Sequence, residues 1–289
     1  MTTESILKKV RKIEIKSRGL SNHFFSGAYH TAFKGRGMSF SEVREYSPGD
    51  DVRTIDWNVT ARLRTPYVKV FHEERELTVM LMIDISASSY FGSFHQQKIE
   101  LIAELAAVIA FSAQTNNDKI GVLFFSDKIE KYIPPKKGKS HILRIIREIV
   151  TIQPSAHRYT DINACFEYFN RATKKRTIAF TISDFVGLKG EKSLNVTARK
   201  HDLIGIHIYD DYEKDLQDVG IIKIKDSETG KAYWIDSRDK ELKSVLSQSF
   251  QLNKEHTQQL FQKNNASFLS VNVKEDYVKA LHGFFQKQK

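Results

Sequence analysis

The sequence predicts an α/β fold in which a mostly parallel central sheet carries helices on both faces. From about residue 77 onward, short runs rich in β-branched residues alternate with segments whose apolar residues recur at helical spacing. The first run, residues 77–83, is apolar almost throughout, as expected for a strand buried on both sides. Two later alternating segments flank a glycine-containing turn, which predicts a β-hairpin inserted at about residues 219–237.

The remaining elements follow in a regular order along the chain. The predicted strands after 77–83 are 120–125 with 129–133 beside it, 177–183, 203–208, the hairpin strands 221–225 and 232–235, and 268–273. The predicted helices are 94–115, 141–150, 161–172, a short one near 190–200, 239–264 and 277–285. This order assigns residues 77–289 to one main domain, preceded by a block at 31–76 and a basic N-terminal helix with its linker at 1–30.

The block at 31–76 is dense in glycine, charged and aromatic residues. We expect a rigid cluster of paired charges packed on the main domain, with Trp57 as its apolar anchor. The charged members of this cluster are Glu42, Arg44, Asp50, Asp51, Arg53, Asp56 and Arg62. A metal site for catalysis at Asp50, Asp51 and Asp56 is the alternative, and nearby arginines that would neutralise these carboxylates argue against it.

Composition limits the class of protein. The 289 residues, 40% hydrophobic and 11% aromatic, are enough for a substantial core. The single cysteine, Cys165, excludes an intramolecular disulfide and lies in an apolar stretch, so we expect a buried, inert thiol. The N-terminus lacks the apolar core of a signal peptide, and the longest apolar run, 101–113, is too short to span a bilayer. We therefore expect a cytoplasmic protein.

Much of the formal net charge of +10 lies near the N-terminus, since residues 1–40 hold eight Lys or Arg and two Glu. Ile6, Leu7, Val10 and Ile13 form an apolar stripe at helical spacing, and basic residues cover the other faces. We expect this helix to pack its stripe on its own domain. The alternative is that residues 1–18 contact anionic lipid at the inner membrane or an acidic partner. No stacking motif, zinc finger or recognition helix indicates nucleic acid.

Oxygen-bearing side chains follow the first buried strand. Asp84, Ser86 and Ser88 stand at alternate positions where the strand opens into a loop, and ligands of open α/β sheets bind at the carboxyl ends of strands. Thr160 precedes a predicted helix, and Asp184 ends another predicted strand. A set of carboxylates and hydroxyls suits Mg²⁺ or Mn²⁺ better than zinc or copper. The alternative is that Ser86 and Ser88 cap the next helix while Asp84 accepts backbone N–H bonds.

This set, Asp84-x-Ser86-x-Ser88 with Thr160 and Asp184, resembles the metal-ion-dependent adhesion site (MIDAS) of von Willebrand A domains. The resemblance covers about residues 77–209 and 267–287, and it implies a Rossmann-like von Willebrand A domain. It also implies that Asp84 and both serines contact the metal or its waters, that Thr160 coordinates in an open state, and that Asp184 acts mainly through water. The resemblance also implies that a carboxylate of a partner protein takes the free coordination position of the metal. Arg158 and Tyr159 stand where this family commonly has glycines.

The preceding block resembles a specific bacterial family. Its motifs are Gly35-Arg-Gly37, Phe40-x-Glu42-x-Arg44-x-Tyr46, Pro48-Gly-Asp-Asp51, Arg53-x-Ile55-Asp-Trp57, Thr60-Ala-Arg62 and the run from Phe71 to Arg75. They resemble the fifty-eighth catalogued domain-of-unknown-function family, in which such a block precedes a von Willebrand A-like domain. Membership implies an association with MoxR-type AAA+ ATPases and a role in assembling or activating other proteins.

We therefore expect a non-enzymatic module that presents Mg²⁺ or Mn²⁺ to an acidic residue of a partner protein. Two alternatives stay open: a metal-dependent hydrolase of phosphoesters, and a scaffold docked at the membrane surface by the basic N-terminus. Against the hydrolase, the chain has no Walker-type glycine loop, no Asp-x-Asp nucleophile motif and no Gly-x-Ser-x-Gly elbow.

Overall fold

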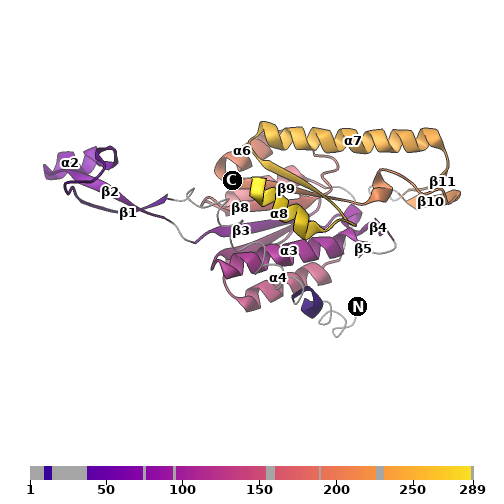
Figure 1. The fold of residues 1–289 in the computed structure, drawn as a ribbon, viewed down its shortest axis with the longest axis horizontal. Helices are drawn as coiled ribbons and strands as arrows, with labels where there is room; N and C mark the ends of the chain where they lie inside the picture. The colour runs from indigo at the N-terminus through magenta and orange to yellow at the C-terminus, as the bar shows by residue number, and fades with distance from the viewer. Residues whose placement is uncertain are drawn as a thin grey trace. The chain divides into compact units, whose positions relative to one another are not determined.

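The computed structural model describes residues 10–14, 38–73, 76–93, 96–153, 160–188, 190–225 and 231–287. The chain forms two compact units (Figure 1). Phe33–Leu77 make up one, here called the small unit, and Met1–Ala32 with Thr78–Lys289 make up the other, the main unit.

A six-stranded sheet forms the centre of the main unit. In chain order its strands are β3 (Thr78–Asp84), β6 (Lys119–Phe125), β7 (Ile129–Lys136), β8 (Ile178–Ser183), β9 (Asp202–Tyr209) and β12 (Ser267–Asn272). Their order across the sheet is β12-β9-β8-β3-β6-β7, and β7 alone in this sheet runs antiparallel to its neighbour. The predicted α/β fold with a mostly parallel sheet is confirmed.

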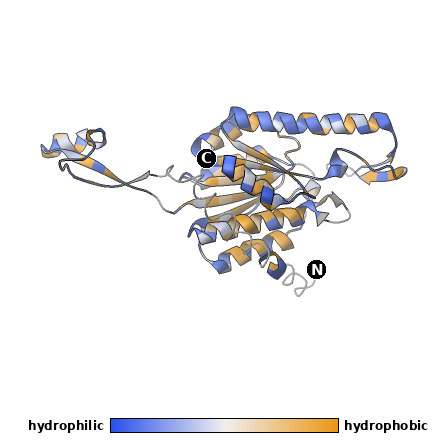
Figure 2. Ribbon diagram, in the orientation of Figure 1, coloured by the Kyte–Doolittle hydropathy of each residue, from blue (hydrophilic) through white to orange (hydrophobic). Residues whose placement is uncertain are grey.

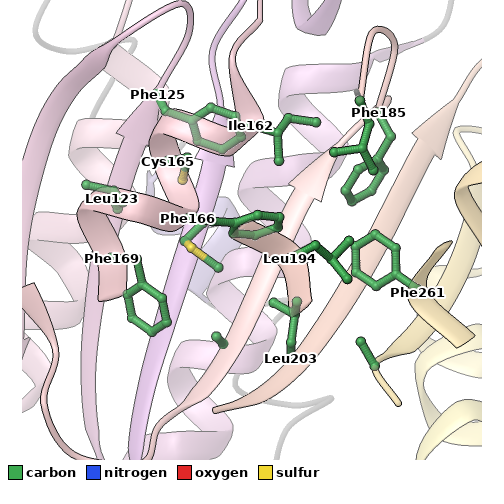
Figure 3. Close-up of a cluster of buried hydrophobic side chains, with 14 of the residues drawn as sticks. Leu123, Phe125, Ile162, Cys165, Phe166, Phe169, Phe185, Leu194, Leu203 and Phe261 are labelled. Carbon is green, nitrogen blue, oxygen red and sulfur yellow. The ribbon is translucent and has the colours of Figure 1, made fainter. Parts of the chain in front are cut away.

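Helices cover both faces of this sheet. They are α3 (Lys98–Thr115), α4 (Lys139–Thr151), α5 (Ile162–Ala172), α6 (Lys192–Lys200), α7 (Lys240–Lys263) and α8 (Tyr277–Lys287). Side chains from α5, α6 and the C-terminal end of α7 pack with strand residues in one buried cluster (Figure 3). The helices α3, α4 and α8 lie on the opposite face (Figure 1). There the rings of Phe180 from β8 and Phe285 from α8 lie 6.3 Å apart.

Alternation along the strands divides their side chains between these faces. Met80 and Met82 of β3 belong to the cluster under α5, and Val79, Leu81 and Ile83, which alternate with them, are equally buried. Both faces of the strand are therefore apolar, which explains its near-continuous hydrophobic sequence. Figure 2 shows that the central strands are hydrophobic, whereas α7 is largely hydrophilic.

The packing of α7 on the sheet depends on Gly205 of β9. A Cβ atom at this position would lie 2.6 Å from a ring carbon of Phe261, which is fully buried at the end of α7. Glycine therefore lets the helix approach the strand closely.

The antiparallel edge strand β7 contains Pro134 and Pro135. Pairing with β6 shifts register at this point, between the partners Ile133 and Lys136. Proline has no backbone N–H, and it is confined to edge strands and irregular positions of sheets for this reason.

Smaller elements lie around the sheet. The predicted hairpin is observed as β10 (Ile221–Lys225) and β11 (Ala232–Asp236), and the glycine-containing turn between them lies outside the described residues. The others are the 3₁₀ helices η2 (Ala87–Tyr90) and η3 (Asp211–Glu213) and the short strands β4 (Gly92–Ser93) and β5 (Gln96–Gln97). Because β4 and β5 pair before α3, that helix begins at Lys98, four residues later than predicted.

The small unit pairs strand β1 (Met38–Glu45) antiparallel with β2 (Tyr67–Glu73). Between them lie η1 (Val52–Thr54) and helix α2 (Trp57–Leu63). Among the side chains that the structure describes in this unit, Val68 alone is buried.

Candidate functional site

Two neighbouring strands bring the predicted metal ligands to one edge of the sheet. Strand β3 ends at Asp84, and β8, its parallel neighbour, ends at Ser183 directly before Asp184. Parallel neighbours end at the same edge, so residues 100 positions apart in sequence lie close together. Both aspartates are buried.

The Asp84 carboxylate is held on both oxygens. Its Oδ1 accepts a 2.8 Å hydrogen bond from the backbone N–H of Ser86, and its Oδ2 accepts a 2.6 Å bond from the Ser183 hydroxyl. Burial and the neighbouring charge of Asp184 raise the pKa of Asp84 to about 6. The described partners of this carboxylate are neutral donors, and no positively charged side chain among the described residues pairs with it.

The two serines lie between the aspartates. The hydroxyls of Ser86 and Ser88 share a hydrogen bond at 3.0 Å, and the Ser88 hydroxyl is one of the groups that lower the pKa of Asp184. Ser86 precedes η2, but its side chain makes no capping hydrogen bond there. Ser86 therefore does not cap the next helix, as the alternative interpretation expected. The other part of that alternative, a backbone N–H bond accepted by Asp84, is observed.

A buried cation, which the sequence did not lead us to expect, lies beside this cluster. Lys98 is 2% exposed, and its Nζ lies 3.2 Å from Asp184 Oδ2 and 2.9 Å from Glu213 Oε1. Burial acts to lower the pKa of Lys98, but the two carboxylates outweigh it and leave this pKa raised. The ammonium therefore stays charged. Glu213 belongs to η3, where it also accepts from the backbone N–H of Asp210.

The neighbouring Lys98 changes the pKa of Asp184, and the backbone directly after Asp184 is unusual. Burial acts to raise the pKa of Asp184, but Lys98 and the hydrogen bonds from Ser88 and Val186 outweigh it and leave this pKa lowered. The next residue, Phe185, has a φ of +54° and is fully buried. Such a backbone is uncommon for a bulky residue, and strain of this kind concentrates at functional sites.

The fifth predicted ligand stands apart from these contacts. Thr160 lies two residues before α5, and Asp161 caps that helix by accepting from the backbone N–H of Ala164 at 3.0 Å. Within the described part of the chain, no hydrogen bond joins Thr160 to the other four ligands. Arg158 and Tyr159, the departure from the adhesion-site pattern, lie outside the described residues.

The charged block of the small unit forms local pairs. Arg44 donates to both carboxylate oxygens of Asp50, at 2.9 and 2.6 Å. Asp56 caps α2 and lies 3.4 Å from the Lys69 ammonium. Asp51 caps η1 and pairs with Arg53 at 3.6 Å. In the described residues, no three His, Cys, Asp or Glu side chains are grouped as a metal site.

Our expectation that Trp57 anchors the block as a buried residue is wrong. Its side chain is 71% exposed, at the first position of α2. The physical reason is that α2 buries none of its residues, so the block provides no second apolar layer around the ring. Val52 and Leu63 of the same unit are also exposed. Glu42 and Arg62 are exposed as well.

Other predictions concern single residues and the N-terminus. Cys165 is a buried free thiol, and burial raises its pKa well above the usual value, as expected for an inert group. Residues 10–14 are helical, Val10 and Ile13 are buried, and Glu14 lies 2.9 Å from the Lys139 ammonium. These contacts agree with a helix that packs on its own domain. None of the described helices has the length and apolar character that crossing a bilayer requires.

Comparison with known proteins identifies relatives of the chain. Residues 42–256 match a family described as "Protein of unknown function DUF58". Uncharacterised proteins of Mycobacterium bovis and Mycobacterium tuberculosis are each 31% identical over 223 residues, which is 76% of this chain and 70% of theirs. An uncharacterised protein of Mycobacterium avium is 28% identical over 101 residues, 34% of this chain and 59% of that protein.

Similar solved structures include the conserved hypothetical protein BatB from Bacteroides thetaiotaomicron. It is 14% identical, covers 73% of this chain and 98% of its own, and has a TM-score of 0.47. An aerotolerance-related membrane protein from Bacteroides fragilis is 17% identical, covers 73% and 99%, and has a TM-score of 0.46. The SpRpn10 VWA domain is 12% identical, covers 71% and 94%, and has a TM-score of 0.39.

Proposed function

We propose that this chain, which belongs to the DUF58 family, is a non-enzymatic, metal-dependent protein-interaction module built on a von Willebrand A-type domain. One observation carries the proposal: Asp84, Ser86, Ser88 and Asp184 gather at the carboxyl ends of two adjacent strands. The proposed role is that of an adaptor or assembly factor that works with a MoxR-type AAA+ ATPase.

The residues present fit a hard divalent cation. Two carboxylates and two hydroxyls supply only oxygen, the ligand type that Mg²⁺ and Mn²⁺ prefer. Asp84 has only neutral hydrogen-bond donors among its described partners, so a bound cation would neutralise its charge. Asp84, Ser86 and Ser88 would contact the metal or its waters. Asp184 would act mainly through water, and Thr160 would coordinate in an open state.

The metal would supply an electrophilic position for a partner's carboxylate. Hydroxyl ligands donate little charge, so the cation keeps its attraction for an external acidic side chain. Generating hydroxide in a two-metal hydrolytic site would require more carboxylates than the two present here. The site therefore suits binding better than turnover.

A calorimetric titration with Mg²⁺ and Mn²⁺ tests the metal site. We expect saturable binding to the wild type and none to Asp84→Asn, since the amide keeps the shape of the side chain but removes its charge. Asp215→Ala is the matched control, because Asp215 is an exposed aspartate that lies 3.6 Å from Lys243. No binding to the wild type, or equal binding to Asp84→Asn, would contradict metal dependence.

The partner and the absence of turnover need a separate experiment. We expect a purified MoxR-type ATPase to associate with the chain in Mg²⁺ and to dissociate in EDTA, with Asp84→Asn failing to associate. Association unaffected by EDTA would contradict the proposed mode of binding. Hydrolysis of bis-p-nitrophenyl phosphate that is lost in Asp84→Asn would replace the proposal by a metal-dependent phosphoesterase.

A further inference from the structure

Lys98 occupies a place that is unfavourable for a lysine on two counts. It is the first residue of α3, and a positive charge at a helix N-terminus opposes the helix dipole. Its side chain is buried, and Gln97 before it provides no side-chain cap for the helix. Only strong interactions with specific partners can hold a charged group in such a place.

Those partners are one residue of the candidate metal site and one residue outside it. Asp184 is the last member of the hydroxyl and carboxylate cluster, and the Lys98 ammonium contacts its Oδ2. Glu213 comes from η3 on a different segment, and no hydrogen bond joins it to Asp84, Ser86 or Ser88 within the described residues. A metal at the candidate site would therefore share Asp184 with Lys98, but it would not contact Glu213, the second partner of Lys98.

The charges around Lys98 are not balanced. Asp184 and Glu213 both contact the single ammonium, and Asp84, which interacts with Asp184, has no cation among its described partners, so three carboxylates are matched by one described positive charge. A divalent cation carries the matching charge. It would, however, share Asp184 with an ammonium already in contact with that carboxylate, and two cations on one carboxylate repel each other.

We propose that Lys98 is an internal cation that competes with the divalent metal for Asp184 and thereby keeps the metal affinity of this site low. When the metal binds, Lys98 gives up Asp184 and stays paired with Glu213. The site thus has two states, one with the ammonium on Asp184 and one with the metal. Metal binding is coupled through Lys98 to η3.

The test is a Mn²⁺ titration by calorimetry of the wild type, Lys98→Met and the double variant Lys98→Met/Glu213→Gln, with near-UV circular dichroism to establish folding. We expect Lys98→Met to bind Mn²⁺ at least tenfold more tightly than the wild type. The double variant removes one positive and one negative charge, so the net charge of the cluster is that of the wild type. It should still bind more tightly than the wild type, because the competitor is gone. The matched control is Lys131→Met, whose ammonium pairs with Glu148 on the surface.

The outcomes separate this inference from the metal site on which it rests. Binding by the wild type that Lys98→Met does not strengthen, or a double variant equal to the wild type, would overturn the competition but leave the metal site standing. Binding by Lys98→Met alone would support the competition and contradict metal dependence of the wild type. No binding by the wild type, by Lys98→Met or by the double variant would overturn both the competition and the metal site.

A further variant keeps the test decisive if Lys98→Met does not fold. In Glu213→Gln the ammonium retains Asp184 as its one carboxylate partner, so its hold on Asp184 strengthens. We expect Mn²⁺ binding to weaken at least threefold relative to the wild type. Unchanged or tighter binding by folded Glu213→Gln would overturn the proposal.

Discussion

The main unit and the small unit both gather charged residues of opposite sign, but they place them in opposite environments. In the main unit, the buried side chains of Lys98 and Asp184 meet the partly exposed Glu213 across long sequence separations. In the small unit, Arg44 and Asp50 pair over six residues on the surface. Exposed pairs contribute little to stability because water screens them, whereas a buried charge that loses its partner is costly. The small unit's density of charge therefore says little about where the energetically important charges lie.

Replacing Lys98 should produce the largest effect on stability. Lys98→Met leaves the buried Asp184 carboxylate and the partly exposed Glu213 without their cation, and breaking a buried pair such as Lys98–Asp184 costs about 3–5 kcal/mol. Urea denaturation of the wild type and the variant in EDTA measures the difference. Lys131→Met should change the midpoint far less, because both members of that pair are partly exposed. Equal effects of the two variants would remove the contrast between buried and exposed charges.

The main unit should also account for most of the pH dependence between pH 6.5 and 4. Burial lowers the pKa of His201 to about 4, and its two ring nitrogens have no hydrogen-bond partner in the described residues. The unfolded chain takes up a proton at this histidine below pH 6.5 and the folded chain does not. The stability that His201 contributes is therefore present above pH 6.5 and lost as the pH falls towards 4, by about 3 kcal/mol.

The free energy of unfolding of the wild type and of His201→Leu, measured from pH 7 to pH 4, isolates this histidine. The difference between the two should shift in favour of the variant as the pH falls, since leucine takes up no proton. A difference that stays constant with pH would show that His201 does not titrate in this way.

The smallest effect is expected at Trp57. Its ring is 71% exposed, and surface substitutions usually change stability by no more than about 0.5 kcal/mol. Phe166→Ala in the cluster under α5 is the comparison, because truncating a buried aromatic residue costs about 3–5 kcal/mol. Thermal denaturation of both variants measures the contrast. A loss of several kcal/mol for Trp57→Ala would show that its ring is covered in solution.

The same two regions explain how far the sequence could predict the structure. Strands such as β3 and β8 are recognisable because both of their faces are buried, so their residues are apolar without interruption. In the small unit, β1 and α2 escaped prediction because almost none of their described side chains is buried. Apolar residues in these two elements do not recur at the spacing that indicates a buried face of a helix or strand. The expected anchoring role of Trp57 is wrong for the same reason, because α2 buries none of its residues.

The candidate site was predictable only in part. Asp84, Ser86 and Ser88 form a local pattern after a strand, and Asp184 ends a second strand, so sheet topology brings them together. Lys98 and Glu213 belong to no such pattern and meet only through the fold. The signal in the sequence was weak: Lys98 begins a largely apolar helix, but Glu100 and Glu104 in its first turns could equally have been its partners.

The two prolines of β7 bear on how copies of the chain behave towards one another. Pro134 and Pro135 remove two consecutive amide donors from the outer strand of the sheet, at the point where its pairing with β6 is already irregular. A strand from another molecule that approached this edge would find no continuous ladder to extend, which is a common protection against aggregation. The sheet can therefore keep a long apolar interior without offering this edge as a template for self-assembly at high concentration in the cell.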